Sequence, residues 1–299
     1  MRYEKPPLSF AQQADRLIQR GLLVSDRDQL IERLSTVSYY RLSAYWHPFK
    51  QADNRFSPGT SFETVWQRYV FDRHLRLIVM DAIERVEVAV LRTRMVEHVA
   101  LTYGPFSYRQ RTIFQISFND NHYQRLLEEC DQMFDRSKEL FADHFRAKYT
   151  AERYPPLWMM AEVMTYGQLL TMYRNLKHQD QKAIASNLGL AAPVLDSWLH
   201  TLHYTRNVVA HHARLWNRHL AVKPRLPKPQ HRPEFHTPVA TSNDRVFGVL
   251  SLLRYLMMQV APQSRWPQRL ANLLAAYPDL PYAAMGFPPN WQEYPLWRE

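Results

Sequence analysis

Apolar residues recur at three- and four-residue steps between residues 61 and 100, and this pattern constrains the fold more than any other feature. The clearest series is Leu75, Ile78, Val79, Ala82, Val86 and Val90. Charged residues such as Arg76, Arg85 and Glu87 lie between them. Such spacing places the apolar side chains on one face of an α-helix. The sequence therefore predicts one long amphipathic helix here, with its apolar face in a core.

The glycine and proline content predicts helical structure for the rest of the chain as well. The sequence contains only 7 glycines, whereas its 20 prolines cluster between helical stretches. This distribution disfavours glycine-rich phosphate loops and β-sandwiches with many tight turns. Further helices are predicted within 10–50, 119–149, 157–176, 192–221, 243–261 and 265–276. We expect an all-α helical bundle with an N-terminal helical subdomain and additional C-terminal helices.

Two parts are expected. Residues 1–58 form the N-terminal helical subdomain, packed by Leu17, Leu30, Leu34 and Tyr40. Residues 59–299 form the larger domain, with a proline-rich basic loop over 221–241 that cannot be helical. Its C-terminal tail, MGFPPNWQEYPLW, is expected to pack its aromatic side chains onto the body.

Positive charge is concentrated in one part of the chain. The formal net charge is +10, and no Asp or Glu occurs from Ser197 to Pro233. The cations in this window are Arg206, Arg214, Arg218, Lys223, Arg225, Lys228 and Arg232. Such an excess favours a polyanionic partner, because neutralising phosphates releases counterions. We interpret the last six as RNA-binding residues; a merely basic protein is the alternative.

The segment RNVVAHHARLWNR (206–218) has the highest density of side chains that can bind phosphate or transfer protons. On a helical wheel, His211 lies about 40°, Arg214 about −20° and Arg218 about 20° from Asn207. His212 lies about 140° away, at the border of the apolar face. The opposite side collects apolar residues: Leu202, Val209, Trp216 and Leu220. The sequence predicts a helix with its apolar face in the core and a basic stripe exposed to solvent.

The stripe contains what metal-free RNA cleavage needs. Neutral imidazole transfers protons near physiological pH, and guanidinium grips phosphate. Asn207, four residues before His211, is predicted to orient its ring, with Arg206 reaching toward the same opening. A base would deprotonate the 2′-OH, which attacks phosphorus and leaves a 2′,3′-cyclic phosphate. Because one motif supplies one well-placed histidine, a homodimer is expected to provide the second.

Several assignments remain as alternatives. His212 and Glu162 are possible supporting residues, with Glu162 either paired to an arginine in the core or at the surface. Zinc binding is disfavoured because adjacent histidines diverge on a helix, and Cys130 is the single cysteine; no metal or cofactor is expected. A catalytically silent RNA-binding protein and a helix-turn-helix regulator built on residues 10–50 are competing functions. No signal peptide or membrane-length apolar run is visible, which predicts a cytoplasmic protein.

The same residues resemble a known family. Arg206-Asn207-x-x-x-His211 is similar to the R-x4–6-H signature of HEPN ribonucleases. Together with YYRLSAYWHPF (39–49), FDRHLRLIVMDAIERVEVAVLRTR (71–94), PPLWMMAEVMTYGQL (155–169) and MGFPPNW (285–291), it resembles the Abi-like family of abortive-infection proteins. The resemblance implies a HEPN core, an antiphage or toxin-type role, and RNA cleavage by Arg206 and His211 with support from Asn207. It also implies association with a structured non-coding RNA.

Overall fold

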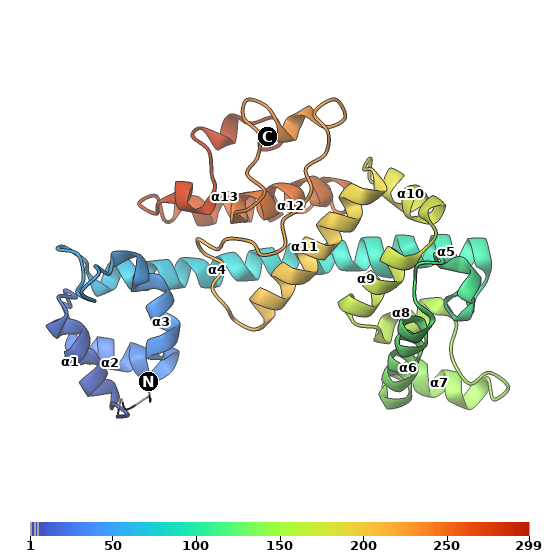
Figure 1. The fold of residues 1–299 in the computed structure, drawn as a ribbon, viewed down its shortest axis with the longest axis horizontal. Coiled ribbons are helices and arrows are strands. Elements are labelled where there is room, and N and C mark those ends of the chain that lie inside the picture. Colours follow the sequence, from blue (N-terminus) through green and yellow to red (C-terminus); the bar gives the residue numbers. More distant parts are fainter. Residues whose placement is uncertain (1, 3, 5, 299) are drawn as a thin grey trace. The chain divides into compact units, whose positions relative to one another are not determined.

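A helical run from Phe62 to Tyr103 dominates the fold, as the apolar spacing predicts. It consists of α4 (Phe62–Val86), the π-helical segment η2 (Glu87–Met95) and α5 (Val96–Tyr103) (Figure 1). All six apolar residues of the predicted series are buried. The wider π geometry of η2 interrupts the α-helical spacing, and π segments are frequent beside functional sites.

The computed structural model describes residues 2, 4 and 6–298, and this part of the chain is all-α. Its only β pairing consists of isolated bridges, and it contains no sheet. Within the same residues we find no helix with the length and hydropathy that crossing a bilayer requires. The all-α prediction is confirmed.

The first of two compact units comprises Met1–Leu77, Arg214–Trp216 and Gln268–Leu280. Its first helices are α1 (Phe10–Gln19), α2 (Arg27–Val37) and α3 (Tyr39–Trp46). Leu17, Leu30 and Leu34 are buried, as predicted, but Tyr40 is 79% exposed. The prediction for Tyr40 is wrong because α3 turns Leu42, Tyr45 and Trp46 toward the core instead.

The second unit comprises Ile78–Ala213, Asn217–Pro267 and Pro281–Glu299. Its later helices are α6 (Asp120–Arg136), α7 (Leu140–Lys148), α8 (Leu157–Val163), α9 (Tyr166–Asn175), α10 (His178–Ser186), α11 (Ala192–Ala210) and α12 (Val246–Val260), while α13 (Trp266–Ala275) is shared with the first unit. Helix α11 packs against α9, α10 and α12. These contacts bury one face of α11, through residues that include Leu195, Trp198 and Leu202.

The C-terminal tail packs as predicted. The ring of Phe247 on α12 lies 4.7 Å from that of Phe287, and it stacks on Trp297 at 5.7 Å. Trp291 contacts both Phe287 and Trp297. The 221–241 segment is non-helical apart from a short 3-10 turn at Pro233–Phe235, which confirms that prediction too.

Candidate functional site at the end of helix α11

Helix α11 ends at Ala210, in the middle of the motif. His212 has φ of +55°, in the left-handed region. Its N–H donates to the carbonyl of Val209 (2.9 Å), and the N–H of Ala213 donates to that of Val208 (2.9 Å). This pair of bonds is the Schellman motif, which satisfies the last carbonyls of a helix and reverses the chain. The predicted helix over 192–221 is therefore wrong beyond residue 210.

The early end of α11 removes Arg214 and Arg218 from the predicted stripe. Arg214 belongs to the first unit, where its Nη1 donates to the carbonyl of Ala44 (2.9 Å). Arg218 is half-buried in the second unit, and its Nη1 donates to the hydroxyl of Tyr204 on α11 (3.3 Å). The helical-wheel positions of both arginines are wrong because the chain leaves the helix before reaching them.

Arg206 and His211 both lie at the C-terminal end of α11. Arg206 is on the last full turns of the helix, and its side chain is exposed. His211 caps the helix with its backbone N–H on the carbonyl of Asn207 (3.0 Å), and its imidazole is exposed. Among the described residues, neither side chain has a hydrogen bond or ion pair within the protein. Both groups are thus accessible to a ligand.

Asn207 contacts a different histidine from the one predicted. Its Nδ2 lies 3.3 Å from Nε2 of His203, one turn earlier on α11. Helical side chains lean toward the N-terminus, so a residue reaches its i−4 neighbour more readily than its i+4 neighbour. The prediction that Asn207 orients the ring of His211 is therefore wrong; the amide is held against His203.

His203 is a half-buried histidine with a fixed ring. It stacks on Tyr166 with 5.3 Å between ring centroids, and the hydroxyl of Tyr166 donates to the carbonyl of Leu199 (3.0 Å). Burial, together with the positive charges of His200 and Arg206, lowers the pKa of His203 below its usual value. The carboxylate of Glu87 opposes this pKa shift, but it is itself paired with Arg92 at 2.6 Å. His203 is consequently a neutral imidazole at neutral pH.

A polar pocket of about 550 Å³ lies beside His203 within the second unit. Its lining includes the side chains of His122, Arg125, Asn175 and Thr171. His203 therefore lines this pocket and also contacts Asn207 on α11. No sequence pattern predicts this arrangement, because the lining residues come mainly from three helices that are separate in sequence, α6, α9 and α11.

The predicted RNA-binding residues of the 221–241 loop divide into two kinds. Lys223, Arg225 and Lys228 have exposed side chains, as a phosphate-binding role requires. Arg232 instead has a structural contact: its Nε donates to the carbonyl of Gly189 (3.1 Å), and its Nη2 donates to the same oxygen. Its guanidinium also lies 5.1 Å from the ring of Tyr255. Arg232 fastens the loop to the turn between α10 and α11.

The two possible supporting residues have distinct positions. His212 is exposed and provides the left-handed residue that ends α11. Glu162 is exposed on α8, so its surface alternative is the one that the structure has, and the buried ion pair is excluded. The backbone conformation of His212 therefore gives this residue a structural role that requires no catalytic function.

Comparison with known proteins gives one match. A sequence model of the family described as Abi-like protein matches residues 32–217, more than half of the chain. The matched region ends one residue before Arg218 and contains Arg206, Asn207 and His211. No curated protein and no solved structure matches the chain.

Proposed function

Because the chain belongs to the Abi-like protein family, which suggests a function in abortive infection, we propose that it acts there as a metal-independent endoribonuclease. The observation that carries the proposal is that an exposed guanidinium, Arg206, and an exposed imidazole, His211, lie within six residues of each other at one helix end. Neither has an internal partner among the described residues. A cation and a proton-transfer group left accessible together suit phosphodiester cleavage.

The chemistry assigns a role to each group. His211 takes the proton of a ribose 2′-OH as that oxygen attacks the adjacent phosphorus. The bond from phosphorus to the 5′-oxygen breaks, and an acid protonates the leaving oxygen. Arg206 stabilises the charge on the pentacoordinate phosphorus. The products are a 2′,3′-cyclic phosphate and a 5′-hydroxyl, so DNA is not a substrate.

The second proton-transfer group comes from a second copy of the chain. In-line cleavage needs a base and an acid on opposite sides of phosphorus, and His211 supplies one of them. His203, the nearby imidazole on α11, is half-buried and held by Tyr166 and Asn207. We therefore assign His203 and Asn207 to positioning, and the active form to a homodimer. Lys223, Arg225 and Lys228 hold the backbone of the bound RNA.

Cleavage of a labelled single-stranded RNA in EDTA tests the proposal. We expect wild-type protein to leave cyclic phosphate ends. Arg206→Ala and His211→Ala should each lower the rate at least about a hundredfold, the usual contribution of a proton-transfer group or a charge-stabilising donor. Adding an excess of His211→Ala protein to wild type should suppress cleavage if the active unit contains two chains, because a mixed dimer has only one His211.

Matched control variants separate the site from general charge loss. Arg136→Ala on α6 and His144→Ala on α7 remove the same side chains from exposed positions elsewhere, and both should cut like wild type. Cleavage that survives in Arg206→Ala and His211→Ala would place the active site elsewhere. RNA binding without cleavage in any variant would favour the silent RNA-binding protein instead.

A further inference from the structure

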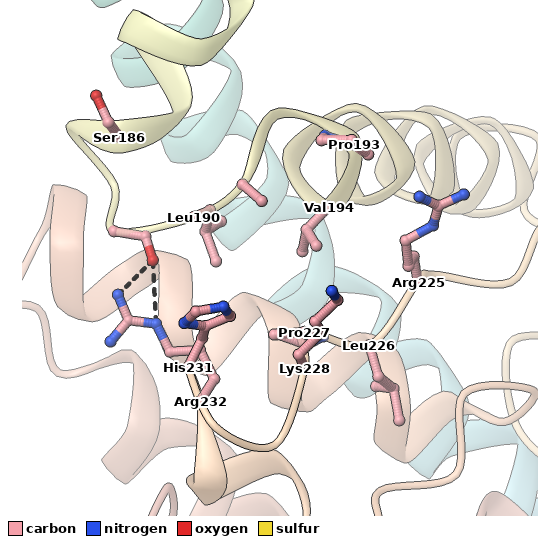
Figure 2. A pocket seen from close by; sticks show the side chains of 12 residues that line it. Ser186, Leu190, Pro193, Val194, Arg225, Leu226, Pro227, Lys228, His231 and Arg232 are labelled. Carbon is pink, nitrogen blue, oxygen red and sulfur yellow. Dashed lines mark hydrogen bonds between the residues drawn. The ribbon is translucent and has the colours of Figure 1, made fainter.

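The loop that follows the motif encloses a pocket at the other end of α11. The pocket has a volume of about 610 Å³ and lies within the second unit, between the α10–α11 turn and residues 225–232. Figure 2 shows Leu190 and Val194 pointing toward the loop, with Lys228 and His231 facing them from the opposite side. A cavity of this size is in the range that holds a small ligand or a single nucleotide.

The lining combines an apolar floor with a cationic rim. The apolar side chains are Leu190, Ala191, Pro193, Val194, Leu226 and Pro227. Arg225, Lys228 and His231 are exposed at the rim. No acidic residue lines the pocket, and the acid-free stretch of the sequence ends just outside it, before Glu234. This chemistry fits a ligand with a flat apolar body and an attached anion.

The pocket is preformed, because its loop is fastened at both ends. The N–H of Arg225 donates to Oγ of Ser197 (2.8 Å), and Nε1 of Trp198 donates to the carbonyl of Arg225 (2.8 Å). At the other end, Arg232 donates to the carbonyl of Gly189, as the dashed lines in Figure 2 mark. A ligand entering this space would not have to order the loop, which lowers the entropic cost of binding.

We propose that this pocket binds a nucleoside phosphate, with the base on the apolar floor and the phosphate on Arg225 and Lys228. Two sources carry that chemistry: a free nucleotide, and an unpaired nucleotide of an RNA strand. If the source is RNA, the pocket holds the substrate of the proposed nuclease, and this part of the inference rests on that function. Helix α11 has 19 residues, so the pocket and the His211 end are about 28 Å apart along its axis. One strand lying along α11 would then be held at one end and cut at the other.

Binding measurements on the full chain test this proposal. The probes are AMP, adenosine, ribose 5-phosphate and a 5′-phosphorylated hexa-adenylate. We expect AMP or the hexanucleotide to bind more tightly than adenosine and ribose 5-phosphate, because only they carry base and phosphate together. Arg225→Ala/Lys228→Ala should weaken that binding about tenfold or more, since both charge-assisted contacts are lost. AMP binding indicates a free nucleotide, and binding of the hexanucleotide alone indicates RNA.

The control is Lys182→Ala, which removes an exposed charge from α10 outside the pocket and should leave the affinities unchanged. Thermal unfolding should be the same for all variants, since each altered side chain is exposed. Equal affinities for AMP and ribose 5-phosphate, or wild-type affinity in the double variant, would overturn the proposal. Arg206→Ala and His211→Ala should retain nucleotide binding, so the loss of one proposal does not entail the loss of the other.

Discussion

The carboxylate of Asp72 accepts the backbone N–H of Trp216 at 2.5 Å and that of Leu215 at 3.1 Å. All three residues belong to the first unit. The same carboxylate is paired with Arg76 and accepts the hydroxyl of Tyr45 (2.5 Å). Asp72 is fully buried, so these donors are what stabilise its charge in the interior. The segment that follows the candidate site is thus anchored to α4.

Asp72→Asn should destabilise the protein by about 3 kcal/mol, because it leaves Arg76 buried without its counter-charge. Urea unfolding measures the loss. The matched control is Glu129→Gln, which breaks an exposed i,i+4 pair with Arg125 at 3.0 Å on α6. That change should cost less than about 0.5 kcal/mol. Equal effects of the two substitutions would show that the buried network does not stabilise the fold.

His212 provides a second prediction, because it has a left-handed backbone, φ +55°. A residue with a Cβ pays about 1 kcal/mol in that region, and glycine does not. His212→Gly should therefore raise the free energy of unfolding by up to about 1 kcal/mol and retain any RNA cleavage. His212→Val should lower it, because a β-branched residue disfavours this backbone. If His212→Gly abolishes cleavage while the fold is stable, His212 and not His211 is the catalytic histidine.

The long helical run was predictable because its signal is local and repeated. Six apolar residues from Leu75 to Val90 lie on one face of the helix, and all six are buried. The end of α11 had no comparable signal. Glycine is the usual left-handed residue after a helix, and here a histidine occupies that position. Trp216 and Leu220 continue the apolar spacing by coincidence, since the chain has already left the helix.

The candidate site was predictable in residue type but not in contacts. Arg206 lies on α11 as predicted, whereas His211 lies just after its last residue, Ala210. The partner of Asn207 depends on a choice between two histidines at equal separation in sequence, which side-chain direction decides. The anchoring of Arg232 depends on a carbonyl at Gly189, 43 residues earlier in the chain. Neither the pocket beside His203 nor the one under the basic loop has a signature in a single segment.

His203 predicts a dependence of stability on pH. Its pKa in the folded protein is lowered, chiefly by burial, so the unfolded chain takes up the proton first as the pH falls. The free energy of unfolding should decrease from about pH 6.5, the ordinary pKa of histidine, down to the lowered pKa of His203. The difference between wild type and His203→Gln, measured by urea unfolding at pH 7.5 and 5, isolates this contribution. A pH dependence identical in the two proteins would contradict it.

Gly189 should be irreplaceable in the α10–α11 turn for two separable reasons. Its φ is +65°, and a Cβ there would overlap the guanidinium of Arg232 and lie 3.0 Å from the hydroxyl of Tyr255. Gly59 has φ of +81°, and no atom lies within 4 Å of a Cβ placed there. At Gly59, therefore, only the backbone conformation disfavours a substitution. Gly59→Ala should therefore lower the free energy of unfolding by about 1 kcal/mol. Gly189→Ala should lower it by about 1–3 kcal/mol more, the range for overpacking.

Because Arg232 fastens the loop, Gly189→Ala should also weaken nucleotide binding in the adjacent pocket, whereas Gly59→Ala should not. Thermal unfolding and the AMP titration together check both effects, and equal stability of the two variants would show that Arg232 moves away without cost.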